Sequence, residues 1–208
     1  MTTVIALVSQ KGGVGKSTIT RGVAREAAKG GLKVKVADLD TQQGTSVEWQ
    51  RRRLDAKLEP VVSVENFSTA SQALAEADRY DLLLIDAPAR TSAGTLEIAR
   101  RADLVIQPTG ASLDDLYPAV REFHALVKAG VPREKLVFAL NRLGTESEEV
   151  ETRAYLGEAG YGVLDGALFE RPAYRRAQDQ GLSITETQYG SLNARADALI
   201  QAIIDRIN

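Results

Sequence analysis

The sequence predicts an α/β fold, a three-layer sandwich of helices around a mostly parallel central sheet. Short apolar runs recur along the whole chain, and stretches with helical spacing of apolar residues separate them. The runs are nearly continuous rather than alternating, which is typical of strands buried on both faces and therefore of parallel sheets. A length of 208 residues, with no repeat and no convincing linker, predicts a single domain over 1–208.

The first expected strand, 4–8, is short, apolar and rich in β-branched residues, and it runs into a glycine-rich turn. A helix is expected over 17–29, because two glycines follow it and glycine is favoured after helix C-termini. The second strand, 34–37, ends at Asp38. This strand–turn–helix–strand order is the beginning of a parallel sheet with right-handed crossovers.

The rest of the chain continues the alternation. Helices are expected over 46–55, 69–77 and 118–129. Further strands are expected at 61–64, 82–85, 104–107, 135–140 and 163–168. A last helix begins at Ser191, and its broad apolar face is expected to pack on the sheet. Ligands of such sheets bind at the carboxyl ends of the strands, so the residues after each apolar run are the candidates for function.

Composition excludes several classes of site. The chain has no cysteine, which excludes disulfides, iron–sulfur clusters and thiolate zinc sites. A single histidine, His124, excludes a histidine-rich metal site, and we expect it to be structural or solvent-facing. The net charge is −2, so any contact with nucleic acid requires a local basic patch. No signal-peptide pattern and no apolar run of about 20 residues is seen, which predicts a cytoplasmic protein.

The turn after the first strand carries the strongest motif in the chain. Residues 10–18 read QKGGVGKST, a glycine-rich turn between a strand and a helix. Glycines allow successive N–H groups to face an anion, and the helix N-terminus adds its dipole. Lys16 is expected to reach the β- and γ-phosphates of a nucleotide, and the Ser17 hydroxyl to hold Mg²⁺. The sequence therefore predicts a P-loop that binds ATP and Mg²⁺.

Two further strand ends carry polar side chains. Residues 84–88 read LIDAP, and apolar residues leading into Asp86 form a Walker B signature whose carboxylate is expected to hold Mg²⁺. The second strand ends in Asp38 and Asp40, and a carboxylate beside a P-loop is able to orient a water molecule. Capping of the next turn by Asp40 is the alternative interpretation.

The loop departs from the ordinary P-loop, because Gln10 stands in place of the first glycine and a second lysine, Lys11, follows it. This pattern resembles the deviant Walker A motif of the ParA/MinD ATPases. The similarity is greatest to the short, ParF-like ParA-type partition ATPases and extends over nearly the whole chain. The stretches that carry it are 38–49, 108–114 and 168–184, besides the loop itself.

The resemblance implies roles for particular residues. Lys11 would reach across a dimer to the partner's ATP, where a cation supplied in trans is worth about 10³–10⁵ in rate. Asp40 would position the attacking water, although Thr41 replaces the family's usual proline and puts the hydrolysis rate in doubt. Asn141 would contact the adenine; a turn residue with left-handed φ is the alternative. The implied catalytic residues are Lys11, Lys16 and Asp40, and the implied nucleotide-binding residues are Lys11, Gly12, Gly13, Val14, Gly15, Lys16, Ser17, Thr18 and Asn141.

The resemblance also implies partners: a homodimer formed with ATP, non-specific DNA of the nucleoid, and a ParB-like or other cargo-bound adaptor that stimulates hydrolysis. Three basic clusters are candidates for contact with DNA: residues 51–53, Arg100 with Arg101, and Arg171 with Arg175 and Arg176. A solvated helix face is the ordinary interpretation of such charges. The third cluster is favoured, because one helical segment would present Arg171, Arg175 and Arg176 together.

Two other functions remain open. The first is a peripheral membrane ATPase similar to MinD, which would need a membrane-binding final helix. That helix carries both basic and acidic residues and lacks bulky aromatic residues, so membrane contact is not expected. The second is a small-molecule kinase or ligase of the same fold, similar to dethiobiotin synthetase, which the second lysine disfavours.

Overall fold

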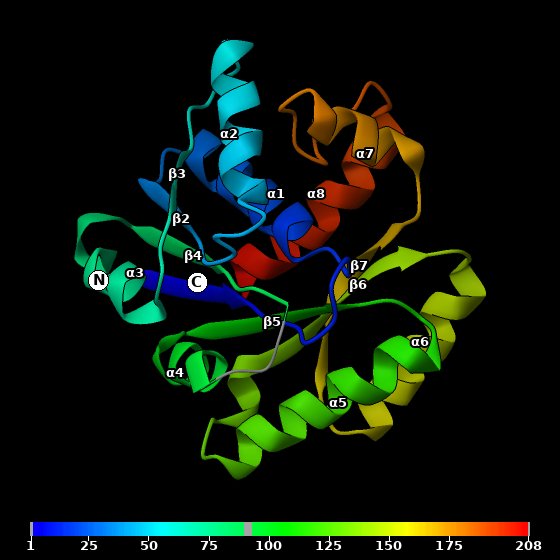
Figure 1. Ribbon diagram of the computed structural model, residues 1–208. Coiled ribbons are helices and arrows are strands. Elements are labelled where there is room, and N and C mark those ends of the chain that lie inside the picture. Colours follow the sequence, from blue (N-terminus) through cyan, green and yellow to red (C-terminus); the bar gives the residue numbers. More distant parts are fainter. Residues whose placement is uncertain (1, 90–92, 208) are drawn as a thin grey trace.

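The computed structural model describes residues 2–89 and 93–207. Seven strands form one sheet in the order β3-β2-β4-β1-β5-β6-β7 (Figure 1). The strands are β1 (Thr3–Leu7), β2 (Val34–Asp38), β3 (Ser63–Asn66), β4 (Leu82–Asp86), β5 (Leu104–Thr109), β6 (Leu136–Leu143) and β7 (Gly162–Phe169). All six strand pairings are parallel, so the sheet is wholly rather than mostly parallel.

Helices cover both faces of the sheet, which confirms the three-layer sandwich (Figure 1). On one face lie α1 (Lys16–Lys29), α2 (Thr45–Asp55), α7 (Pro172–Asp179) and α8 (Gly190–Asp205). On the other face lie α3 (Ala70–Ala75), α4 (Ala93–Arg101), α5 (Leu113–Lys128) and α6 (Glu146–Glu158). Single 3₁₀ turns occupy Ala77–Arg79 and Arg133–Lys135.

Alternate residues of each strand contribute to two separate cores. In β1, Ile5 and Leu7 pack beneath α1 and α8, whereas Val4 and Ala6 pack beneath the helices of the other face. All four side chains are buried. The near-continuous apolar runs that predicted a parallel sheet thus reflect burial on both faces.

The predicted elements are found, with shifts at their ends. The helix expected to begin at Pro118 instead begins at Leu113 and contains Pro118. Proline in the second turn removes one backbone hydrogen bond, and the long apolar face of α5, which includes the fully buried Phe123, compensates for that loss. His124 of this helix has its Nδ1 2.7 Å from the Tyr161 hydroxyl, as expected for a structural residue.

The final helix packs on the sheet as expected. Leu199, Ile200 and Ile203 of α8 are buried against β7 and α1. The helix begins at Gly190, next to the expected Ser191, and ends at Asp205. Within the described ranges, 2–89 and 93–207, no helix is long and apolar enough to cross a membrane.

Candidate nucleotide-binding site

The candidate site lies at the carboxyl end of the sheet, around the loop that joins β1 to α1. Strand β1 occupies the centre of the sheet, and the chain passes from it to β2 on one side and later to β5 on the other. Strand order therefore reverses next to β1, which is where open α/β sheets bind their ligands. The carboxyl ends of β2, β4 and β6 bring Asp38, Asp86 and Asn141 to the same edge.

The loop backbone is arranged to receive an anion. Two of its carbonyl oxygens are held by side chains: Arg142 Nη1 donates to Gly13 O at 2.7 Å, and Asn141 Nδ2 donates to Val14 O at 2.6 Å. The backbone N–H groups of residues 12–18 have no acceptor within the described part of the chain. These N–H groups and the N-terminus of α1 together form a nest for phosphate.

Gly15 is required by this geometry. It caps α1 in a left-handed conformation, with φ of 107°. A Cβ atom at Gly15 would lie 1.9 Å from Asn141 Nδ2. Both its conformation and its contact with Asn141 therefore exclude a side chain at this position.

Lys16 is placed beneath the loop and is only 8% exposed. Its Nζ lies 3.5 Å from Lys11 O. Burial lowers the pKa of Lys16, and the charges of Asp86, Glu122 and Asp40 oppose that shift. A buried ammonium held beside free N–H groups provides a further positive site for phosphate oxygens.

Ser17 and Asp86, the predicted metal ligands, are brought together. Ser17 and Asp86 line the same cavity, and Thr45 Oγ1 donates to Ser17 Oγ at 3.1 Å. Burial raises the pKa of Asp86 to about 6. A hydroxyl and a carboxylate are oxygen ligands of the kind that Mg²⁺ prefers, and a divalent cation would offset the buried charge.

The described residues contain no cluster of three or more histidine or acidic side chains suited to a metal ion. Mg²⁺ keeps several waters and is usually held by one or two protein groups together with substrate phosphates. The pair Ser17 and Asp86 fits that requirement.

Several residues that support this pair were not predicted. Ser46 Oγ donates to Asp86 Oδ2 at 2.8 Å, and Ser46 N donates to Asp38 Oδ2 at 2.9 Å. Arg21 is buried beside them, with its Nε 3.4 Å from Ser46 Oγ. Burial lowers the pKa of Arg21 to about 10, against the charges of Asp86 and Asp38. The sequence does carry a signal for Arg21, because it is a charged residue on the apolar face of the helix that follows the P-loop.

Asp40 lies at the entrance of the same space. With Lys16, Ser17, Arg21 and Asp86 it lines a cavity of about 280 Å³. Its Oδ1 accepts a hydrogen bond from Gln43 N at 3.1 Å, so the alternative interpretation, a cap of the next turn, is present in the structure. Its role in orienting water stays a prediction.

Lys11 points away from this cavity, and its Nζ forms an ion pair with Asp115 of α5. With Asn141, Arg142 and Glu170 these two residues line a second cavity of about 570 Å³ on the other side of the loop. Almost half of the Lys11 side chain is exposed. The second lysine is thus held within its own chain at the rim of the site.

Asn141 occupies a different position from the one that a turn residue would take. It is a buried residue of β6, and the left-handed residue is its neighbour Arg142, with φ of 60°. The alternative of a left-handed turn residue at Asn141 is therefore wrong. Its amide holds the P-loop through Val14 O, while contact with an adenine stays a prediction.

The three late arginines lie on or beside one short helix, as expected. Arg171 precedes α7, and Arg175 and Arg176 belong to it; all three side chains are exposed. Arg175 Nη2 lies 3.3 Å from Glu170 Oε1, and Glu170 also accepts a hydrogen bond from Arg142 at 2.8 Å. Ion pairs thus join α7 to the residue that holds the P-loop carbonyl.

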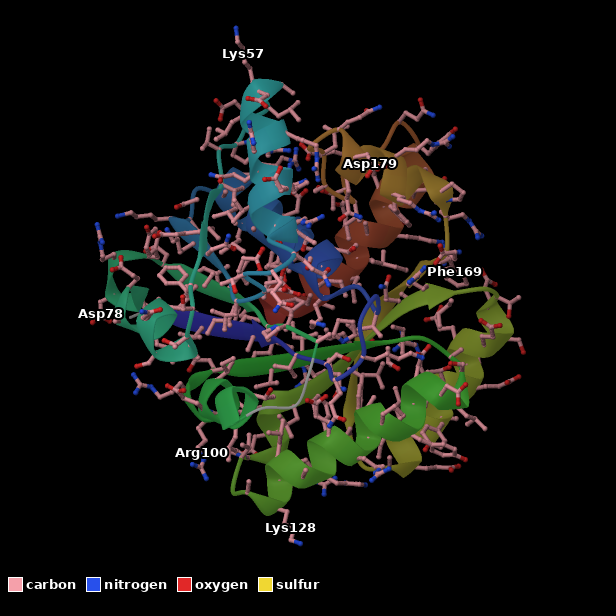
Figure 2. All side chains as sticks on the ribbon, in the orientation of Figure 1. Lys57, Asp78, Arg100, Lys128, Phe169 and Asp179 are labelled. Atoms are coloured by element: carbon pink, nitrogen blue, oxygen red, sulfur yellow. The ribbon has the colours of Figure 1, made fainter. Side chains whose placement is uncertain are left out.

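The other basic clusters differ from one another. Arg100 projects from the periphery at the end of α4 (Figure 2), where its Nη2 donates to Ala129 O at 3.0 Å. Arg51 is exposed on α2, in agreement with a solvated helix face. That interpretation is wrong for Arg53, which is 1% exposed and paired with Glu186. Its side chain fills the space between α2 and residues 181–186.

A three-layer sandwich with a glycine-rich loop between its central strand and the first helix defines the class of P-loop nucleoside triphosphatase folds. The model of the family described as the CobQ/CobB/MinD/ParA nucleotide binding domain matches residues 5–184 of this chain. The chain therefore belongs to the CobQ/CobB/MinD/ParA family.

Individual relatives agree with this assignment. The chain is 32% identical to the chromosome-partitioning ATPase Soj of Thermus thermophilus over 82% of this chain and 84% of Soj. The cell division ATPase MinD of Pyrococcus furiosus superposes with a TM-score of 0.77 at 19% identity, over 99% of both chains. The septum site-determining protein MinD of Pyrococcus horikoshii, solved with Mg-ADP, gives 0.76 at 19% identity over 100% of this chain and 97% of that one. The likeness to the two solved structures shows the fold alone.

Proposed function

We propose that this protein is a ParA-type partition ATPase that hydrolyses ATP to ADP and phosphate with Mg²⁺ and alternates between a monomer and an ATP-bound sandwich dimer. The observation that carries the proposal is the loop with two lysines, one buried beneath it and one at its rim. The 32% sequence identity with the chromosome-partitioning ATPase Soj supports the partition function. The Mg-ADP complex of the MinD neighbour supports the choice of nucleotide and metal.

Each part of the site has a distinct role in the proposed reaction. The free N–H groups of residues 12–18 and the Lys16 ammonium bind the β- and γ-phosphates and stabilise the charge that develops on them. Ser17 and Asp86 would hold Mg²⁺, which supplies charge compensation for the phosphates. Asp40, beside Lys16 and Asp86 in the same cavity, orients the attacking water. Asn141, whose amide holds the loop at Val14 O, would contact the adenine.

Dimer formation in this proposal requires Lys11 to leave Asp115 and to meet the ATP of the partner subunit. The ion pair is partly exposed, so it is worth about 0–1 kcal/mol and does not prevent the exchange. ATP favours the dimer because Lys11 contacts the nucleotide only there, which is the differential contact that a ligand-driven switch needs.

Substitution of Lys11 tests the trans role. Lys11→Ala is expected to abolish ATP-dependent dimerisation, measured by light scattering on a sizing column, and to lower the rate of ATP hydrolysis by the protein about 10³-fold relative to the unsubstituted protein. Asp115→Asn is the matched control, since it frees Lys11 and should change the dimerisation constant by no more than about fivefold, towards the dimer. Normal dimerisation of Lys11→Ala with ATP would contradict the trans role.

Contact with DNA is proposed for Arg171, Arg175 and Arg176 of the ATP-bound dimer. The three exposed guanidinium groups lie on or beside α7, which a salt bridge joins to the P-loop partner Arg142 through Glu170. Phosphate contacts of this kind are independent of base sequence and sensitive to salt. The protein would therefore associate with the nucleoid, and a ParB-like or other cargo-bound adaptor would stimulate hydrolysis and release the subunits.

Binding to a random-sequence DNA duplex at two salt concentrations, with ATP or ADP, tests this function. We expect tight binding with ATP alone, with log K falling by about 0.9 per phosphate neutralised for each tenfold rise in salt. Arg176→Ala should weaken the binding and lower that slope, whereas Arg101→Ala, on the opposite face, should leave both unchanged.

If the protein binds DNA neither with ATP nor with ADP, the result would contradict the nucleoid model and would favour the membrane ATPase instead. The packing of Leu199, Ile200 and Ile203 in the core does not favour that alternative, because the apolar face of α8 is already occupied. Co-sedimentation with anionic vesicles in the presence of ATP distinguishes the two functions, since the partition ATPase is not expected to bind them.

A further inference from the structure

A buried carboxylate lies directly behind the start of the P-loop. Glu122 belongs to α5 and is 2% exposed. Its Oε2 accepts a hydrogen bond from the backbone N–H of Gln10 at 3.1 Å and another from Gln107 Nε2 at 2.9 Å. Glu122 thus joins α5 to strand β5 and to the first residue of the loop, the position at which this chain has Gln10 instead of glycine.

The contact occurs where the chain leaves the sheet. Leu7 pairs with Ile106 of β5, and Val8 N donates to Ile106 O at 3.0 Å. In a parallel ladder the next donor of this strand would be Gln10 N, and its acceptor would be Pro108 O. Gln10 N donates to the Glu122 carboxylate instead. The Glu122 carboxylate therefore takes the place of a β5 carbonyl as the acceptor of Gln10 N–H. This hydrogen bond fixes the direction in which the loop leaves the sheet.

Packing alone does not explain a carboxylate at this position. Burial raises the pKa of Glu122, against the Gln10 N–H and the charge of Lys16, so the ionised group is costly to keep. Its Oε1 and the Oε1 of Gln107 are buried without a hydrogen-bond partner among the described residues. An apolar residue of similar volume would fill the same space at lower cost. A buried charge retained under these conditions indicates a function.

We propose that Glu122 is a positioning residue of the nucleotide site, which holds the backbone of Gln10 and thereby sets the path of the phosphate-binding loop. It acts through the loop and does not touch the nucleotide. The loop is then fixed at two ends, by Glu122 before its glycines and by Asn141 and Arg142 at the carbonyls of Gly13 and Val14. The inference rests on the proposed function, in which this loop binds ATP.

Two substitutions separate the hydrogen bond from mere packing. Glu122→Ala removes the acceptor of Gln10 N–H and leaves the loop free at its start. Glu122→Gln keeps an acceptor oxygen for Gln10 N–H in a side chain of the same shape. The conservative variant is therefore expected to rescue the loop, whereas the alanine variant is not.

The first measurement is amide hydrogen exchange in the nucleotide-free protein. We expect exchange over residues 10–15 to be about tenfold faster in Glu122→Ala and unchanged in Glu122→Gln. The second is the affinity for Mg-ATP, expected to fall about 10- to 100-fold in Glu122→Ala, as for loss of a hydrogen bond to a charged group, and by less than about threefold in Glu122→Gln. Glu186→Ala is the matched control, because it removes a largely covered carboxylate that pairs with Arg53 rather than with the loop and should lower the melting temperature without changing either readout.

The outcomes are distinct. Unchanged exchange in Glu122→Ala, or equal losses in both variants at position 122, would overturn the inference. Failure of the unsubstituted protein to bind Mg-ATP would contradict the proposed function instead, and the exchange measurement would still decide whether Glu122 orders the loop.

Discussion

Asp86→Asn is expected to stabilise the nucleotide-free protein at neutral pH and to abolish its magnesium-dependent hydrolysis of ATP. The carboxylate is 2% exposed, and burial raises its pKa from 3.8 to about 6. For a carboxyl group whose pKa is higher in the folded state, the stabilising contribution is fully present below pH 3.8 and is lost as the pH rises through 6. The ionised group therefore costs up to about 3 kcal/mol at pH 7.5.

Urea unfolding at pH 5 and pH 7.5 measures this effect. The unsubstituted protein should lose stability over that interval, and the Asp86→Asn protein should lose less, since Asp38 keeps a raised pKa in both proteins. Asp78→Asn is the control, because this exposed residue on the periphery (Figure 2) should change the free energy of unfolding by no more than about 0.5 kcal/mol.

Addition of Mg-ATP is expected to reverse the order of stability of the unsubstituted protein and Asp86→Asn. Mg-ATP should raise the melting temperature of the unsubstituted protein and raise that of Asp86→Asn much less, because the substitution removes the carboxylate of the proposed Ser17 and Asp86 metal pair. An Asp86→Asn protein that is less stable at both pH values would show that the hydrogen bond from Ser46 to Asp86 matters more than the cost of the buried charge.

The fold was predictable from the sequence because each strand carries its own signal. The apolar run of β4, for example, is buried on both faces and needs no partner to be recognised. Strand order is a different kind of property. The position of β4 between β1 and β2 depends on how helices of similar amphipathicity pack on the sheet. No local pattern of residues predicts that position.

The candidate site divides in the same way. Asp86 ends its own strand, and Lys16 and Ser17 begin the helix after the loop that follows β1, so motif and position predict them together. Glu122 contacts Gln10 across 112 positions of sequence, and no pattern around Glu122 distinguishes it from the other acidic residues of the chain. Residues that support a site from a distant element therefore appear only when the chain is folded.

Charge patterns are the weakest guide, as the residues at 51–53 show. Three successive arginines on a helix cannot share one face, because neighbouring positions differ by about 100°. Arg51 is exposed while Arg53 points into the interior. A run of charges thus predicts a solvated face only for the positions that the helix directs outwards.

Replacement of Arg53 by alanine is expected to destabilise the protein by about 3–5 kcal/mol, the largest loss of stability that we predict. The guanidinium donates to Glu59 O at 2.6 Å, to Pro60 O at 3.1 Å and to Gly181 O at 3.1 Å. It also donates to Glu186 Oε2 at 2.8 Å and Oε1 at 3.2 Å. Substitution would remove the donor of these acceptors and leave the Glu186 carboxylate without its main partner, which costs more than the absence of both partners.

The matched control is Arg51→Ala on the same helix, which should change the free energy of unfolding by no more than about 0.5 kcal/mol. For a chain of this size the Arg53→Ala loss corresponds to a fall in melting temperature of roughly 6–20 °C. Equal, small losses for the two variants would contradict a buried structural role for Arg53.

The double variant Arg53→Ala with Glu186→Ala identifies the cause of the loss. Burial tends to raise the pKa of Glu186, but the hydrogen bonds from Arg53 and Ser183 and the charges of Arg53 and Arg25 hold it below its usual value. Glu186 therefore remains ionised at neutral pH, and in Arg53→Ala it becomes a largely covered charge that has lost its main partner. If this unpaired charge causes the loss, the double variant will be destabilised by less than the sum of the two single variants. If the hydrogen bonds from Arg53 to the backbone carbonyls cause most of the loss instead, the stability losses of the two single variants will add. The Arg53–Glu186 ion pair would then be a consequence of the packing between α2 and residues 181–186 rather than its cause.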